Sequence, residues 1–168
     1  MDIKTRLVYL TLVFSLAAAA TLPADTADEA AKADPVTAAL SGETRALLIR
    51  EMQAIDAAMG HVHRALVTGD HGTVVDQARS IHDSFVLAQE MSDAQRHEIH
   101  SRLPADFLQK DQAFHALAGR LVEAGRHADA RLQRLWFGEM TRACQECHAQ
   151  HAGARFPGLK ESAGGTRP

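Results

Sequence analysis

Apolar side chains recur along most of the chain with the three- and four-residue spacing of one helix face. The first run has no proline or glycine before Gly60. Its apolar positions are Leu47, Leu48, Met52, Ile55, Met59, Val62 and Leu66. Because this period matches about 3.6 residues per turn, the pattern predicts a long helix that ends near the sequence TGDHG at 68–72.

Two further helices are predicted in the middle of the chain. The first follows Asp70, whose side chain is suited to cap a helix N-terminus. Its apolar positions are Val74, Val75, Ala78, Ile81 and Phe85. A shorter helix is expected after Ser92, because Ser92 and Gln95 have the spacing of a capping box. It runs through Ile99 to Leu103.

The last third of the chain predicts two more long helices. Pro104 suits the first helical position of one of them, and Gly125 suits its end. The other begins near Ala128 and carries Leu132, Leu135, Trp136 and Met140. No alternating run rich in Val, Ile and Thr predicts a strand. Four long amphipathic segments joined by short turns therefore predict an all-α, antiparallel four-helix bundle.

The N-terminal sequence differs from the helical body. Lys4 and Arg6 precede an apolar run from about Leu7 to Leu16 and a tract of small residues, which is the layout of a secretory signal peptide cleaved after Ala20. The apolar run is shorter than the ~20 residues of a membrane-spanning helix. We therefore expect a signal peptide at 1–20 and a mature periplasmic protein without a stable membrane span.

Composition sets the remaining boundaries. Residues 21–40 are rich in Ala, Asp and Pro and are expected to form a flexible leader, and residues 159–168 a disordered tail. The bundle domain is then expected at 41–158. The chain has 168 residues, and its 46% hydrophobic content with only 5% aromatics suits a single helical domain. A net charge of -3 with dispersed basic residues does not favour nucleic-acid binding.

The only two cysteines of the chain lie in the sequence CQECH, as Cys144 and Cys147, and His148 follows directly. On a helix these three positions are i, i+3 and i+4, so their side chains share one face. Cys-x-x-Cys-His is the attachment pattern of c-type haem, in which both thiols form thioethers and the imidazole binds the iron. The motif therefore predicts one covalently attached haem c.

Three other functions of a cysteine pair are alternatives to haem attachment. A structural zinc site usually has four N or S ligands, so it would need two distant histidines. A redox-active pair of the thioredoxin kind should follow a strand at a helix start. A disulfide between i and i+3 within a helix closes a very short loop and stabilises little. Each of these fits the sequence less well than haem attachment.

With this motif near the end of a predicted four-helix bundle, and a signal peptide in front, residues 41–158 resemble the cytochrome c′ and cytochrome c-556 group of periplasmic class II cytochromes. The specific part of the resemblance is CQECH at 144–148. It implies that Cys144 and Cys147 hold the haem and that His148 is the proximal iron ligand. It also implies a homodimer packed through the first two helices.

In that group the first helix covers the distal face of the haem, and one position there carries Met in six-coordinate members. Matching Met59-Gly60 to the aromatic-Gly pair of that helix places Met52 at this position. Met59 is the second candidate for the sixth ligand, and His82 is the third. Both methionines also fit an interpretation as core residues, because Met commonly fills gaps on apolar helix faces.

One position departs from the pattern of the group. Members that bind gases usually have Arg four residues after the proximal histidine, where this chain has Ala152. The nearest basic residue is Arg155, for which two interpretations remain open. Its guanidinium either pairs with a haem propionate or is solvated in a loop.

These observations predict an electron carrier with His/Met-ligated haem iron and no enzymatic activity. The alternative is a five-coordinate binder of nitric oxide or carbon monoxide. An enzyme such as a peroxidase is less favoured, because the sequence shows no paired acid/base cluster. The sequence does not identify the redox partner.

Overall fold

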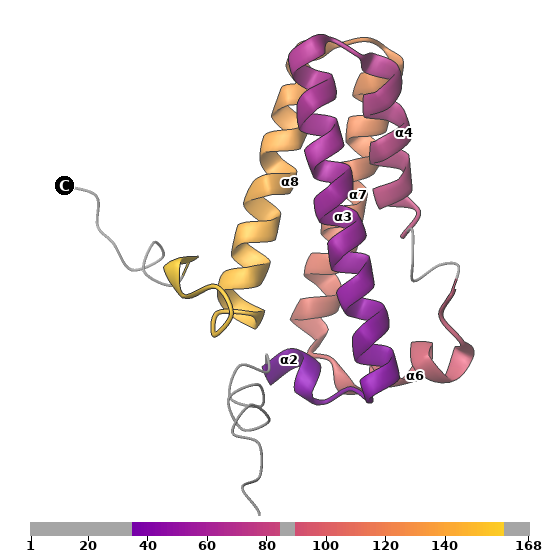
Figure 1. Cartoon of the computed structure of the whole chain (residues 1–168), viewed down its shortest axis with the longest axis vertical. Coiled ribbons are helices and arrows are strands. Elements are labelled where there is room, and N and C mark those ends of the chain that lie inside the picture. The colour runs from indigo at the N-terminus through magenta and orange to yellow at the C-terminus, as the bar shows by residue number, and fades with distance from the viewer. Residues whose placement is uncertain (1–34, 85–89, 160–168) are drawn as a thin grey trace, which may run out of the picture. The chain divides into compact units, whose positions relative to one another are not determined.

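The computed structural model describes residues 35–84 and 90–159, and Figure 1 shows how their helices are arranged. Helices and turns make up these residues, which contain no strand, so the predicted all-α class is confirmed. No helix within them is both long enough and apolar enough to span a membrane. The predicted signal peptide at 1–20, most of the leader, residue Phe85 and all of the tail except Leu159 lie outside the described residues.

The first long helix, α3, spans Gly42–Thr68. It begins at Ser41, whose side chain accepts a hydrogen bond from the backbone N–H of Thr44. It ends at Gly69, which has a φ of 74°. This left-handed conformation costs glycine little because glycine has no Cβ.

The predicted caps of the next two helices are confirmed. Helix α4 spans His71–His82, and the Asp70 side chain accepts a hydrogen bond from the backbone N–H of Thr73. Helix α6 spans Asp93–Arg102 and begins with a complete capping box formed by Ser92 and Gln95. Within α6, the Glu98 carboxylate accepts hydrogen bonds from Ser41 and Thr44 and so holds α6 against the start of α3.

Helix α7 spans Ala105–Arg126 and α8 spans Ala130–His151. Pro104 lies one position before the first helical residue rather than on it. The prediction that Gly125 closes α7 is wrong, because Gly125 is a buried residue within the helix. A Cβ on Gly125 would lie 2.6 Å from Val75 Cγ2, so the glycine allows α4 and α7 to approach closely.

Two clusters of buried apolar side chains stabilise the fold. The main core cluster joins α3, α4, α7 and α8 and contains Ile55, Ala58, Val62, Ala65, Val74, Ala78, Ile81, Phe114, Ala118, Leu121, Val122 and Met140. The end cluster contains Leu40, Leu48, Ile99 and Leu103, and Phe107 packs against it. All four long helices thus contribute to one core, as expected for a helical bundle.

The end cluster corrects the predicted start of the domain. Residues up to 40 were assigned to a flexible leader, but Pro35–Ala38 forms the short helix α2. Leu40 is buried against residues of α3 and α6. The apolar side chains of Val36 and Leu40 pack with that cluster, and this burial favours an ordered conformation before α3.

Candidate functional site

The CQECH sequence lies in the last two turns of α8. Cys144, Cys147 and His148 are all half-buried, and Cys144 packs against the main core cluster. Neither cysteine forms a disulfide within the described part of the chain. The helical interpretation of the motif is therefore confirmed, and the i, i+3, i+4 spacing places the three side chains on one face of α8.

The surroundings of Cys144 disfavour its thiolate. Burial, and to a smaller extent the neighbouring Cys147 and the negative charge of Asp56, raise the pKa of the Cys144 thiol to about 11. Redox-active and zinc-binding cysteines react as thiolates and commonly have lowered pKa values. The environment of Cys144 is therefore of the opposite kind to that of a redox-active thiol.

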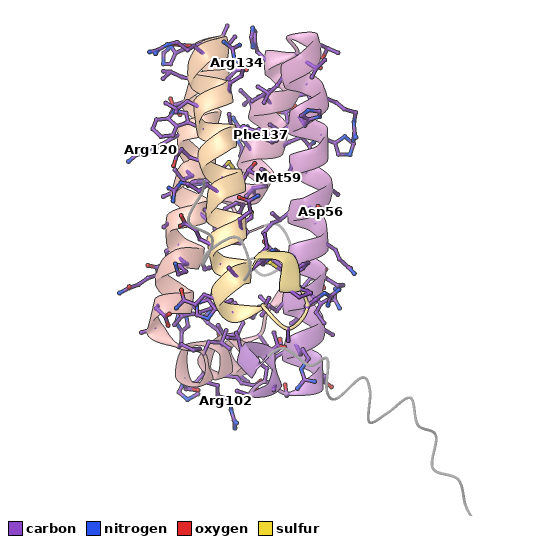
Figure 2. The ribbon with its side chains drawn as sticks, turned by 90° about the vertical axis from the view of Figure 1, so that its left-hand side faces the viewer. Asp56, Met59, Arg102, Arg120, Arg134 and Phe137 are labelled. Atoms are coloured by element: carbon purple, nitrogen blue, oxygen red, sulfur yellow. The ribbon has the colours of Figure 1, made fainter. Side chains whose placement is uncertain are left out.

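The part of α3 beside this region carries Asp56, Met59 and His63. Figure 2 shows Met59 of α3 and Phe137 of α8 in the space between the two helices, with Asp56 further along α3. The rings of His63 and Phe137 have centroids 6.2 Å apart. Met59, Phe137 and Cys144 all pack against the main core cluster. These residues of α3 thus lie beside the part of α8 that carries the motif.

Met52 lies four residues before Asp56 on α3 and exposes 37% of its surface. Ile49, one turn earlier, is 38% exposed. Steps of three and four connect Ile49, Met52, Asp56, Met59 and His63, so they form a second stripe on α3 beside the stripe that enters the core. Met52 is therefore a surface residue of this stripe and not a residue of the main core cluster.

His148 stacks against Phe156, which follows α8. The two ring centroids are 4.6 Å apart and the ring planes differ by 13°. Phe156 belongs to the turn that begins at Ala152, the C-cap of α8. Arg155 is exposed in the same turn, and its guanidinium has no hydrogen bond or ion pair among the described residues. The geometry therefore links His148 to an aromatic side chain that the sequence analysis did not select.

The end of α8 is anchored to the start of α7 through His151, which is 8% exposed. Its Nε2 atom lies 3.5 Å from Asp106 Oδ2. Its ring also meets the ring of Phe107 edge-on, with centroids 5.4 Å apart. These contacts fix the helical turn that carries His148.

The two other candidates for the iron ligand, His82 and Met59, have different surroundings. His82 is exposed at the end of α4, where its Nδ1 is 2.8 Å from Asp83 Oδ1. Its ring lies close to Gly119 of α7. Met59, in contrast, is half-buried against the core, as the alternative interpretation predicted. Of the two, only Met59 shares a neighbourhood with Cys144.

Residues 35–84 and 90–159 contain no group of three or more His, Cys, Asp or Glu side chains arranged to hold a metal ion directly. Haem does not require such convergence. Its thioether bonds form at the rim of a wide macrocycle, whereas the histidine binds the iron at the centre. Two thiols and an imidazole spread along one helix face fit a ligand of that kind.

The structure also gathers three titratable residues that the sequence analysis missed. Glu51 of α3 is only 1% exposed, and its charge acts on His115 of α7. His115 Nδ1 is 2.6 Å from the carbonyl oxygen of Ile81, and Nε2 is 3.5 Å from Asp111 Oδ1. The sequence signal was Glu51 itself, which lies between Leu48 and Ile55 in the buried stripe of α3.

Comparison with known proteins adds no relative. The chain matches no protein-family model, no curated protein and no solved structure. The resemblance to class II cytochromes therefore depends on the motif and on the helical architecture of this chain.

Proposed function

We propose that this protein is an exported c-type cytochrome that carries electrons, with one haem attached to Cys144 and Cys147 and with His148 as proximal ligand. The observation that supports this most directly is the placement of two cysteines, neither in a disulfide, and an imidazole on one face of α8. When bound, haem supplies an iron that changes oxidation state by one electron without a substrate. The residues of the chain hold it, cover it and set its potential.

The proposal includes an antiparallel arrangement of α3 and α8, which one ring contact and one electrostatic interaction support. His63 of α3 lies against Phe137 of α8, and the charge of Asp56 reaches Cys144. Asp56 lies seven residues before His63, whereas Cys144 lies seven residues after Phe137. Moving seven residues toward the N-terminus of α3 thus corresponds to moving seven residues toward the C-terminus of α8, as in an antiparallel pair.

This register favours Met52 as the sixth ligand. Four residues beyond Asp56 and Cys144, the same steps reach Met52 on α3 and His148 on α8. Both helices rise about 1.5 Å per residue, so Met52 is level with His148, whereas Met59 is about 10 Å away along the axis. A thioether at Met52 would therefore be at the same level as the imidazole, which supports Met52 over Met59 as the sixth ligand.

The polar and apolar groups around the motif suit a carrier. Ile49 and Met52 offer exposed apolar surface, and the main core cluster supports Cys144 from behind. Burial in apolar surroundings and the identity of the axial ligands are the means by which a protein sets a haem potential. We place the protein in the periplasm, because the predicted signal peptide fits the compartment in which bacteria attach haem c.

Acid-acetone extraction of the purified, exported protein tests the attachment. Thioethers survive this treatment and coordination bonds do not, so the haem should remain with the protein. Cys144→Ser and Cys147→Ser should each sharply lower the yield of haem-bearing protein, whereas Gln145→Ser, between them and exposed, should not. A colourless protein with all haem in the organic phase would contradict the proposal.

A further inference from the structure

Phe156 stacks on a face of the His148 ring and not on its edge, where the ring nitrogens lie. The ring planes differ by 13° and their centroids are 4.6 Å apart, so Phe156 covers a face of the imidazole. Imidazole nitrogens donate and accept in the plane of the ring. Phe156 therefore restricts rotation of the His148 ring without occupying the positions at which its nitrogens bind.

The main chain holds Phe156 in this place. The Ala152 carbonyl oxygen accepts hydrogen bonds from the backbone N–H groups of Arg155, at 2.9 Å, and of Phe156, at 3.1 Å. The backbone N–H of Ala152 in turn donates to the carbonyl oxygen of His148, at 2.9 Å. Pro157 follows directly and narrows the backbone conformations open to Phe156. The turn thus returns the chain over the helix end by hydrogen bonds that do not depend on the side chain of Phe156.

The helix end beneath the stack is itself fixed. His151 is buried beside Asp106 and Phe107, one turn after His148. Ala152 and Gly153 are buried as well. Both stacked rings are therefore attached to backbone that is hydrogen-bonded or buried, and this restricts their mutual orientation.

We propose that Phe156 is a positioning residue that sets the orientation of the His148 imidazole plane, and thereby the ligand field at the metal. The inference rests on the proposed function, since it assigns His148 as a ligand. A histidine ligand needs a second contact to fix its ring, which is usually a hydrogen bond to the other nitrogen. The stacked face of Phe156 is a contact that restrains the plane of the His148 ring.

Electron paramagnetic resonance of the ferric holoprotein tests the proposal, because the g-values depend on the orientation of the imidazole plane. Phe156→Leu keeps an apolar side chain but removes the aromatic face, so it should shift or broaden the g-values and change the reduction potential. Phe156→Tyr keeps the ring and should retain the wild-type values. Leu135→Ala, which removes an exposed apolar side chain earlier on α8, is the control and should change neither.

The outcomes separate this inference from the proposed function. A protein without covalently attached haem overturns both. A haem-bearing protein whose spectrum and potential are the same in the wild type and in Phe156→Leu overturns the positioning role alone. Loss of helix content by circular dichroism in Phe156→Leu would show that Phe156 supports the fold instead, and it would also overturn the proposal.

Discussion

His115 Nε2 lies 3.5 Å from the carboxylate of Asp111, one turn earlier on α7. Burial lowers the pKa of His115, but the hydrogen bond and charge of Asp111, the carbonyl of Ile81 and the charge of Glu51 outweigh it and raise the pKa above its ordinary value. The protonated imidazole thus offers a positive charge to a buried region that contains a carboxylate on α3. The charges of His115 and Glu51 attract each other between α7 and α3.

The raised pKa makes the stability of the protein depend on pH. The contribution of protonated His115 is complete below the ordinary pKa of 6.5 and is lost as the pH rises through the higher value of the folded state. His115→Gln should lower the free energy of unfolding by about 1–3 kcal/mol at about pH 5.5 and by less at about pH 8.5. Urea denaturation at both pH values measures this difference. His97→Gln, on the exposed side of α6, is the control, and an equal loss at both pH values would contradict the assignment.

Replacement of Met52 separates the electron carrier from the gas binder. With Met52 as sixth ligand, the ferric protein should be low-spin and the ferrous protein should bind carbon monoxide slowly. Met52→Ala should then yield a high-spin form that binds carbon monoxide readily. Absorption spectra of both oxidation states, with and without carbon monoxide, record these changes.

Met59→Ala is the matched comparison, because Met59 lies on the same stripe of α3 two turns away. It should leave the spin state unchanged while lowering stability through the lost packing against the core. A wild-type protein that is already high-spin and takes up carbon monoxide quickly would make Met52 a surface residue without a ligand role. The gas-binding function would then be favoured.

The thiol of Cys144 should react slowly in the haem-free protein. With a pKa of about 11, raised mainly by burial, only roughly one molecule in a thousand carries the thiolate at about pH 8. In Cys147→Ser, where Cys144 is the only thiol, alkylation by iodoacetamide followed by mass spectrometry should be slow and should accelerate steeply as the pH rises. Fast alkylation at neutral pH would instead indicate an activated, redox-type cysteine.

Gly125 should be sensitive to substitution and Gly138 should not. A Cβ at Gly125 would meet the β-branched side chain of Val75, which cannot easily rotate away. Gly125→Ala should therefore cost about 1–3 kcal/mol of stability. A Cβ added at Gly138 of α8 would have no atom of a neighbouring element or side chain within 4 Å. Gly138→Ala should therefore stabilise the protein by about 0.5–1 kcal/mol. Thermal denaturation of the two variants compares these effects, and equal melting temperatures would argue against the close approach of α4 and α7.

Much of the fold was predictable because its signals are local. The helix period, the caps at Asp70 and Ser92 and the turn at Gly69 each depend on a few neighbouring residues. Gly125 was misinterpreted because its role depends on Val75, fifty positions earlier in the chain. The early start of the ordered chain was missed for the same reason, since Leu40 is buried by residues of α6.

The same distinction between local and long-range features applies to the site. The spacing of Cys144, Cys147 and His148 on one helix face follows from the sequence alone. The contact of Phe156 with His148 depends on a turn held by hydrogen bonds to one carbonyl, and no periodicity predicts it. His115 escaped notice because its partners lie on three helices, whereas the sequence shows only a histidine among polar and apolar neighbours.

The division of the buried side chains into two clusters implies two levels of stability. The end cluster shares no buried residue with the main core cluster, so α2 and α6 can open while the main core stays closed. Backbone amides of α6 should then exchange with solvent faster than those in the middle of α7. Phe107 joins the end cluster to His151, so such an opening also loosens the last turn of α8. The free energy of this local opening, rather than that of global unfolding, would set how often the motif becomes accessible.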